Sequence, residues 1–228
     1  MIDETSLALF IAPRSPFCRK VVASVVEFGL QHRIDLKIVD PWTCQALRAV
    51  NPLCKVPTLV LPDRTALFDS PVILQYLQTQ SDQLLLPSGD ARWDVLRREA
   101  LADGLADAVI RRFVEGLGQA DERASQMIHR QEQAIFAILD HFQNERAWMA
   151  SAVDLGQVAL ACAIAYLDVR SPALAWQQDC PLLARWFYDF RARTSMMIAA
   201  SPDAGQFRTL DPEPLPAAFV ALSRTGQS

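Results

Sequence analysis

Apolar residues in the first third of the chain follow two different periods. The apolar run from Leu7 to Ile11 predicts a buried strand, and the apolar positions from Val21 to Phe28 recur at helical spacing. Continued along the chain, these patterns predict strands 6–11, 36–39, 58–61 and 66–68, and helices 17–28, 44–49 and 71–80. This order of strands and helices predicts a small mixed sheet with helices on its faces.

A break in this periodicity divides the chain. Residues 81–91 carry no regular pattern, and the clearest turn signal is Pro-Ser-Gly-Asp at 87–90. Near the C-terminus the composition shifts to Pro, Asp, Ser and Thr. We therefore expect a first domain at 1–82, a linker at 83–91, a second domain at 92–202 and a loose C-terminal tail at 203–228.

The second domain is predicted to be all helical. Strand patterns disappear from Arg92 onward, and helices are expected at 92–117, 121–145, 155–169 and 181–194. The helix 155–169 is apolar nearly all round, which indicates the buried centre of a bundle. Ser151 and Asp154 precede it as a capping box, with Ser151 at the N-cap. The inward faces of the other helices are expected to contain Trp93, Leu96, Ala100, Ala106, Val109, Ile110 and Phe113, then Ile128, Ile135, Ile138, Leu139 and Phe142, then Leu182, Trp186 and Phe190.

Composition and charge narrow the function classes. The 228 residues, 51% of them hydrophobic, suffice for packed cores, and the net charge of −4 argues against a nucleic-acid partner. Five scattered cysteines without a C-x-x-C pair indicate a reducing compartment. The acidic N-terminus carries no signal-peptide pattern, and the longest apolar run, 158–167, is too short to span a bilayer. We therefore expect a cytoplasmic protein with no membrane partner.

Metal-binding patterns are also missing from the sequence. The three histidines, His32, His129 and His141, share no metal-ligand spacing, and no H-x-x-x-H occurs. The glycine-rich motifs that bind nucleotides are absent as well. We therefore expect no metal ion.

Three short segments of the first domain carry candidate chemistry. The segment 15–20, Ser-Pro-Phe-Cys-Arg-Lys, puts the Ser15 hydroxyl where a strand leads into a helix, and the N–H groups and dipole of a helix N-terminus favour anions. The segment 51–57, Asn-Pro-Leu-Cys-Lys-Val-Pro, precedes a strand. In the segment 69–71, Asp-Ser-Pro, the serine fits an N-cap and the proline fits the first helical position.

Together with the layout of the two domains, these segments resemble the glutathione transferase superfamily. The first segment resembles the opening of its serine-type members, especially of a bacterial branch with Ser-Pro-Phe/Tyr-x-Arg-Lys. The resemblance implies an α+β thioredoxin-like N-terminal domain that binds glutathione, followed by an all-α helical-bundle C-terminal domain that adds the second-substrate pocket. It also implies a homodimeric enzyme of detoxification that joins glutathione, its co-substrate, to a small electrophile and holds no permanently bound cofactor.

The resemblance assigns catalysis to Ser15. A free thiol has a pKa of about 8.5, and lowering it by about two units requires about 2.7 kcal/mol of preferential thiolate binding. One hydroxyl donor and a helix N-terminus can supply energies of that order. Ser15 would then stabilise the glutathione thiolate rather than attack a substrate. The alternative is that Ser15 only caps its helix.

The resemblance assigns the main glutathione contacts to the two later segments. Val56-Pro57 matches the family's cis-proline, whose preceding residue offers backbone groups to the cysteinyl part of glutathione. The alternative is a turn before a strand. Ser70 and Asp69 match the pair that holds the γ-glutamyl carboxylate and its ammonium group. Plain helix capping is the alternative, and it explains Ser70 but not the acid before it.

Further contacts follow from the same resemblance. Lys55 is expected to pair with the glycyl carboxylate, Trp42 lies in a loop that often reaches the glycyl end, and Phe17 belongs to the same site. Asp103 resembles the acid that reaches the amine of the partner subunit's glutathione. The Arg-Lys pair at 19–20 lies in the first helical turn, where cations oppose the dipole, so it either helps to hold an anion or forms a solvated pair.

The second-substrate pocket is assigned to the first long helix of the second domain. Arg112 and Phe113 lie late in that helix, which lines this pocket in the family. For Phe113 the alternative is a place in the core stripe. No residue set in the sequence identifies the electrophile.

Two other functions remain open at this point. One is a glutathione-binding or ligand-carrying protein without turnover. The other is a glutathione-dependent thiol or peroxide reductase, in which thiol exchange would use Cys18 or Cys54 and the reduction of organic hydroperoxides would use the glutathione thiolate. In Ser15-x-x-Cys18, a serine stands where glutaredoxins have their first cysteine, which is the exposed nucleophile. The loss of that cysteine argues against dithiol exchange, so we expect Cys18 to be a buried helix residue. Cys54 stands where the family pattern has glycine, and it either forms a mixed disulfide with glutathione or does nothing.

Overall fold

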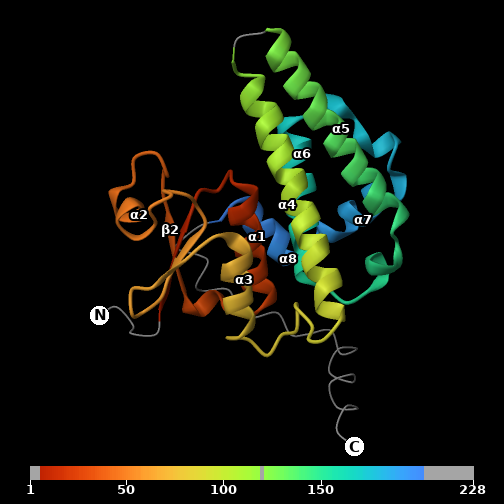
Figure 1. Cartoon of the computed structure of the whole chain (residues 1–228). Coiled ribbons are helices and arrows are strands. Elements are labelled where there is room, and N and C mark those ends of the chain that lie inside the picture. Colours follow the sequence, from red (N-terminus) through yellow and green to blue (C-terminus); the bar gives the residue numbers. More distant parts are fainter. Residues whose placement is uncertain (1–5, 119–120, 203–228) are drawn as a thin grey trace, which may run out of the picture.

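A computed structural model describes residues 6–118 and 121–202 of the chain. A small sheet with its helices lies at one side of the molecule, and a bundle of long helices lies at the other (Figure 1). The predicted fold class, an α+β thioredoxin-like part followed by an all-α part, is confirmed. The predicted C-terminal tail, 203–228, lies outside the described residues.

The four-stranded sheet has the order β2-β1-β3-β4. β1 (Leu7–Ile11) is parallel to β2 (Ile34–Ile38), whereas β3 (Thr58–Val60) is antiparallel to β1 and to β4 (Ala66–Leu67). Alternate residues of β1 are buried, among them Leu9, which pairs with a leucine on each neighbouring strand. The predicted mixed sheet is therefore confirmed. The pattern of apolar positions in the sequence had predicted where its strands lie.

α1 joins the sheet to the helical part of the molecule. Together with α2 (Gln45–Val50) and α3 (Ser70–Gln78), α1 (Pro16–Glu27) accompanies the sheet, and the 3-10 turn η1 (Gln31–Arg33) follows it. α1 packs against α3 and also against three helices of the bundle, α4, α6 and α8. It is therefore buried on several sides, and Figure 1 shows it between the sheet and α8.

The helical part begins where the predicted linker ends. It contains α4 (Ala91–Glu115), α5 (Glu122–Asn144), α6 (Leu155–Arg170), α7 (Pro181–Phe190) and α8 (Thr194–Ala200). The short 3-10 turns between them are η2 (Ala147–Ala150), η3 (Pro172–Leu174) and η4 (Trp176–Gln178). α4 packs against both α5 and α6, and α6 also contacts α1 and α7. The predicted central position of α6 is thus confirmed.

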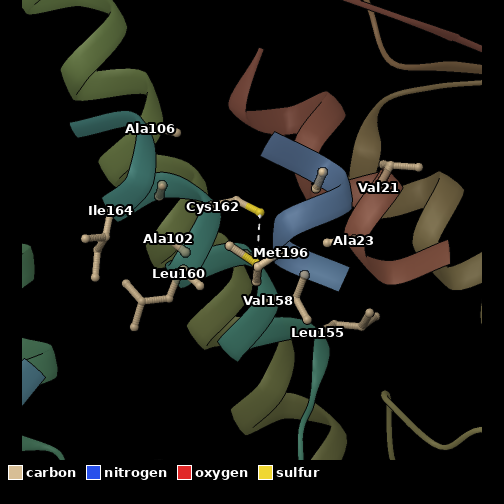
Figure 2. Packing of buried hydrophobic residues seen from close by; sticks show 14 of the residues in the cluster. Val21, Ala23, Ala102, Ala106, Leu155, Val158, Leu160, Cys162, Ile164 and Met196 are labelled. Atoms are coloured by element: carbon tan, nitrogen blue, oxygen red, sulfur yellow. Dashed lines mark hydrogen bonds between the residues drawn. The ribbon is translucent and has the colours of Figure 1, made fainter. Parts of the chain in front are cut away.

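The packing around α6 is shown in Figure 2. Leu160 and Ile164 are among its buried residues, and Ala102 and Ala106 of α4 lie close to it. Cys162 points toward Met196 of α8, with 4.0 Å between the two sulfur atoms. Complete burial raises the pKa of the Cys162 thiol to about 12, so it remains a neutral core group.

The predicted capping box before α6 is wrong in its register. Asp154, not Ser151, is the N-cap, and its carboxylate accepts a hydrogen bond of 2.9 Å from the Gln157 backbone N–H. The Ser151 hydroxyl instead donates to the carbonyl oxygen of Trp148 at 2.7 Å. The short side chain of an aspartate can cap a helix without a second residue. Ser151 is not available as the cap, because its hydroxyl is hydrogen-bonded within the turn before α6.

The predicted single helix 181–194 is also wrong. The chain ends α7 at Phe190 and begins α8 at Thr194. Between them, Arg193 pairs with the Glu27 carboxylate of α1 at 2.8 Å. The hydroxyl of Ser195, in the first turn of α8, donates to the same carboxylate at 2.5 Å. These contacts with a distant helix fix where the chain turns, and periodicity cannot detect them.

The predicted inward faces are partly wrong. Trp93 and Leu182 are 67% and 40% exposed, and Ala100 is exposed as well. The buried face of α4 instead includes Glu99, whose carboxylate pairs with the buried Lys20. A prediction from apolar periodicity assigns every glutamate to the surface. It therefore cannot identify a charged residue that is buried together with an oppositely charged partner.

Membrane-spanning potential is limited to one bent pair of segments. Within residues 6–118 and 121–202, no single helix is long and apolar enough to cross a membrane. Only α6 taken together with the following residues, Pro172–Gln178, meets the criteria of length and hydropathy, and these two segments meet at an angle of 96°. α6 is also the buried core helix of the bundle.

Candidate functional site

A pocket of about 230 Å³ lies where the sheet part meets α4. The beginning of α1, the loop before β3, the beginning of α3 and the middle of α4 form its walls. Its lining residues are Phe17, Asn51, Leu53, Lys55, Val56, Pro57, Phe68, Asp69, Ser70, Asp103 and Asp107. Both polar and apolar groups therefore face the pocket, and its charged groups are mostly carboxylates.

Most of the residues predicted from the sequence to bind glutathione meet in this pocket. Those that line it are Phe17, Lys55, Val56, Pro57, Asp69, Ser70 and Asp103. Sequence reasoning did not single out Leu53, Phe68 and Asp107 as site residues. Leu53 lies inside one of the recognised segments and Phe68 directly precedes another, so their positions in the sequence could have indicated them. Asp107 lies one helical turn after Asp103, so helical spacing could have indicated it.

Ser15 lies at the N-cap of α1, as the sequence predicted. Its hydroxyl oxygen accepts a hydrogen bond of 3.3 Å from the Cys18 backbone N–H, and its own N–H donates to the Ala12 carbonyl at 2.9 Å. The cap uses a lone pair of the oxygen, so the hydroxyl can still donate its proton, and the Cys18 side chain is one acceptor that interacts with it. Among the described residues the pocket lining includes Phe17, two positions further on, but not Ser15 itself.

The loop before β3 is held in shape by a buried asparagine. The Asn51 side-chain amide donates to the Lys55 carbonyl at 3.1 Å and to the Thr58 hydroxyl at 2.9 Å, and its oxygen accepts from the Leu53 N–H at 2.9 Å. The Val56–Pro57 peptide is cis, as the resemblance implied. Within the described residues, no hydrogen bond involves the Val56 backbone, so its polar groups are available at the pocket.

α3 begins one residue earlier than predicted. Asp69 occupies the N-cap position with extended backbone, Ser70 is the first helical residue and Pro71 follows it in the first turn. The Asp69 side chain makes no capping hydrogen bond, so helix capping does not account for this acid. The Phe68–Asp69 peptide is cis, and both residues line the pocket.

A buried charge cluster lies behind the pocket. The Lys20 ammonium is 3.0 Å from the Glu99 carboxylate and 2.7 Å from that of Asp103. Lys20 and Glu99 are almost completely buried, whereas the Asp103 side chain is 22% exposed and reaches the pocket. Burial raises the pKa of Asp103 to about 6, although Lys20 counteracts this rise.

The sequence left two alternatives for the Arg-Lys pair at 19–20, and the burial of Lys20 excludes the solvated pair for that residue. The two adjacent cations have different surroundings. Arg19 Nε donates to the Pro13 carbonyl at 2.8 Å, in the loop that leads to Ser15. Lys20 points toward α4 instead and is 1% exposed. The sequence contained no signal for this difference, because the partners of Lys20 lie about eighty residues away in the chain.

The remaining predicted site residues lie away from this pocket. Trp42 is 88% exposed in the loop before α2. Arg112 pairs with Glu132 of α5 at 2.8 Å, and the Phe113 ring lies 4.3 Å from the guanidinium of Arg170. The assignment of Trp42 to the glycyl end of glutathione, and of Arg112 and Phe113 to a second-substrate pocket, therefore stays a prediction.

The cysteines near the site differ in accessibility. Cys18 is fully buried, and burial raises the pKa of its thiol to about 11, so the expectation of a buried helix residue is confirmed. Cys54 is partly exposed and lies between two residues that line the pocket. No metal-binding group of three or more histidine, cysteine or acidic side chains occurs in the part of the chain that the structure describes.

Family models match both parts of the chain. The model of the glutathione S-transferase N-terminal domain matches residues 14–80, and that of the C-terminal domain matches residues 103–187. YibF of Escherichia coli (strain K12), an uncharacterized GST-like protein, is 30% identical over 196 residues, which cover 83% of this chain and 96% of YibF. The chain therefore belongs to the glutathione transferase superfamily.

Solved structures from this family are similar over most of the chain. A glutathione transferase family member from Pseudomonas fluorescens Pf-5, with bound glutathione, is 38% identical and has a TM-score of 0.80 over 87% of this chain and 100% of that chain. A glutathione S-transferase from Methylobacillus flagellatus KT, also with glutathione bound, is 31% identical, with a TM-score of 0.79 over 86% and 99% of the two chains. A glutathione S-transferase from Methylobacterium radiotolerans, in complex with glutathione sulfonate, is 32% identical, with a TM-score of 0.78 over 86% and 95%.

Proposed function

We propose that this protein is a glutathione transferase that binds glutathione in the pocket and uses Ser15 to stabilise its thiolate. The observation that carries the proposal is the position of Ser15 at the N-cap of α1, two residues before the pocket residue Phe17. Three similar structures contain glutathione or its sulfonate, which supports glutathione as the ligand here.

The groups of the pocket match the groups of glutathione. The backbone N–H and C=O of Val56 suit the cysteinyl backbone, in the manner of an added strand. Ser70 and the beginning of α3 suit the γ-glutamyl carboxylate, and Asp69 suits the neighbouring ammonium group. Lys55, the basic residue of the lining, suits the glycyl carboxylate.

The proposed reaction is a substitution at an electrophilic carbon. The thiol of glutathione releases its proton to water, and the hydroxyl of Ser15 and the N-terminus of α1 stabilise the thiolate. The thiolate then forms a carbon–sulfur bond while the leaving group, such as a halide, departs with its electron pair. Ser15 forms no covalent bond in this scheme, and its contribution is a hydrogen bond to a charged sulfur atom.

Replacing Ser15 tests this role. Ser15→Ala is expected to lower kcat/KM toward an activated aryl halide by about tenfold to a hundredfold, because a hydrogen bond to a charged group contributes about 1.5–3 kcal/mol. The pKa of bound glutathione, followed by thiolate absorbance, should rise in parallel. Ser24→Ala is the matched control, since Ser24 is a buried serine of the same helix whose hydroxyl has no hydrogen-bond partner in the described residues.

The same variant separates the transferase from a glutathione carrier without turnover. Unchanged kcat/KM and an unchanged thiolate pKa in Ser15→Ala would contradict the proposed role of Ser15. Glutathione binding without turnover in the wild type would favour the carrier. Binding that weakens in Asp69→Ala would still establish the pocket as the glutathione site in that case.

We also propose that the enzyme works as a homodimer in the cytoplasm. All five cysteines are free of disulfide bonds, which is compatible with a reducing compartment. Exposed apolar side chains such as Leu84 and Trp93 offer surface for a second copy. Sedimentation analysis of the full chain tests the dimer, and a monomer at micromolar concentration would contradict it.

A further inference from the structure

We propose that Arg19 is a positioning residue for Ser15. Its guanidinium holds the loop between β1 and α1 against the end of α8, and the loop in turn sets where the Ser15 hydroxyl lies. This inference rests on the proposed function, in which that hydroxyl stabilises the glutathione thiolate. Among the described residues the pocket lining does not include Arg19, so its effect on the ligand passes through the loop.

Side chains of α1 fold back onto the loop that leads to Ser15. Arg19 Nε donates to the Pro13 carbonyl oxygen at 2.8 Å. The Cys18 sulfur accepts a hydrogen bond of 3.5 Å from the Ala12 N–H, and the Ser15 N–H donates to the Ala12 carbonyl at 2.9 Å. The contact of Arg19 is the shortest of the three, and it is made by a charged donor, which strengthens a hydrogen bond.

The same guanidinium also reaches the other part of the molecule. Arg19 Nη2 donates to the carbonyl oxygen of Ala200, the last residue of α8, at 3.4 Å. The last carbonyl groups of a helix have no partner within the helix, and a cation is favourable beside them. One planar group therefore joins two backbone carbonyls that lie on distant segments of the chain. Its fixed fork of donors suits such a bridge better than a flexible ammonium would.

The position of Ser15 depends on this loop. As the N-cap, Ser15 has an extended backbone, with φ −76° and ψ 126°, so the loop before it and the helix after it together determine its place. A hydrogen bond weakens as its length and angle depart from the optimum, and a displacement of about 1 Å can lower a catalysed rate by about a hundredfold. A loop that Arg19 ties to α8 keeps the Ser15 hydroxyl in one place relative to the pocket.

The experiment measures the acid dissociation constant of the bound glutathione thiol, by thiolate absorbance, together with kcat/KM toward an activated aryl halide. Arg19→Met keeps the stem of the side chain and removes both contacts, so the dissociation constant and kcat/KM should each fall by about tenfold. Arg19→Lys keeps the charge but has a methylene group where arginine has Nε, so it should show the same fall.

The matched control is Arg14→Met. Arg14 is exposed in the same loop, directly before Ser15, and it makes no hydrogen bond or ion pair within the described part of the chain. This variant removes the same charge close to Ser15 without removing a contact of the loop. Its thiol dissociation constant should therefore equal that of the wild type. Equal falls in Arg14→Met and Arg19→Met, with none in Arg19→Lys, would show that charge acts here and would overturn the proposal.

A double variant tests whether Arg19 acts through Ser15. In the background of Ser15→Ala, Arg19→Met should change the thiol dissociation constant no further, because the hydroxyl that Arg19 positions is already gone. Additive effects would contradict the proposal, since a merely structural role of Arg19 does not depend on Ser15. Urea denaturation of every variant shows that it is folded, and if Arg19→Met does not fold, Arg19→Lys decides.

The outcomes separate this inference from the proposed function. A folded Arg19→Lys or Arg19→Met with the thiol dissociation constant of the wild type refutes the role of Arg19. If Ser15→Ala lowers that constant while the Arg19 variants do not, only this inference fails. If Ser15→Ala itself changes neither the constant nor kcat/KM, the proposed function is wrong as well.

Discussion

A few residues other than glycine have a left-handed backbone conformation, and one of these residues, Cys54, lies next to the pocket. Cys54 has a φ of 52° and lies between the pocket residues Leu53 and Lys55. This conformation costs a residue with a side chain roughly 1–2 kcal/mol, whereas glycine adopts it readily. The family pattern with glycine at this position, noted from the sequence, therefore has a physical reason in the turn itself.

Cys54→Gly is expected to raise the free energy of unfolding by about 0.5–1 kcal/mol, measured by urea denaturation. Cys44→Gly is the control, because Cys44 has a φ of −71° and its sulfur accepts a hydrogen bond of 3.4 Å from the Leu47 N–H at the beginning of α2, so this variant should lose stability. Equal effects of the two substitutions would contradict the argument from backbone conformation. Transferase activity that survives in Cys54→Gly would also exclude a mixed disulfide at Cys54 from the catalytic cycle.

At the scale of the helices, the contact between α4 and α6 depends on Gly156. The Arg98 guanidinium pairs with Asp154 at 3.1 Å, which ties α4 to the N-cap of α6. A Cβ atom at Gly156 would lie 2.9 Å from the Cβ and Nε atoms of Arg98 and 3.0 Å from the Val95 carbonyl oxygen. The two helices can therefore approach this closely only where one residue has no side chain.

Gly156→Ala is expected to lower the free energy of unfolding by about 1–3 kcal/mol, because a side chain would push α4 and α6 apart. Gly104→Ala is the matched substitution on α4, at a position where an added Cβ meets nothing within 4 Å. That variant should gain about 0.5–1 kcal/mol from the higher helix propensity of alanine. Thermal denaturation of both variants checks the opposite signs, and destabilisation of similar size in both would refute the close-approach argument.

At the scale of the whole molecule, α1 connects the two parts through charged contacts at several points. Glu27 contacts Arg193 and Ser195 at the beginning of α8, and Arg19 Nη2 donates to the Ala200 carbonyl at its end, at 3.4 Å. The cluster of Lys20 with Asp103 connects α1 to α4. Because these contacts form only when the two parts of the molecule are packed together, they belong to the folded state alone. The ionisation of Asp103 in the cluster should therefore affect the free energy of unfolding.

The pKa of Asp103 is raised by burial from 3.8 to about 6, so the folded state binds its proton more tightly than the unfolded state. The stabilisation from this proton is complete below pH 4 and is lost as the pH rises through 6. The free energy of unfolding of the wild type, relative to Asp103→Asn, should therefore fall by on the order of 2 kcal/mol between pH 4 and pH 7. Urea denaturation across this range measures the difference, with Asp107→Asn on the same helix as the control; a flat difference would contradict the prediction.

Much of the site was predictable because it consists of short local segments. The motifs around Ser15 and Ser70 predict the N-termini of two helices, and the motif around Val56 predicts the loop before β3. Capping and turn residues within a few positions specify such features well. The buried Asn51 lay inside one of these motifs, although its role in holding the loop appears only in its hydrogen bonds. Lys20 and Glu99 escaped prediction because an isolated lysine or glutamate in a helix is normally exposed.

The sequence by itself determined the order and type of the main elements, the mixed sheet, the central apolar helix and the segments that carry the proposed glutathione contacts. These features follow from hydrophobic periodicity and from capping and turn residues, which act over a few positions of the chain. Only the tertiary structure decided that Lys20 is buried against α4, that the chain breaks between α7 and α8, and that Asp103 joins Asp69 in one pocket. Each of these depends on ion pairs or close contacts between residues distant in sequence, and their energy exists only once the two parts of the molecule are packed together.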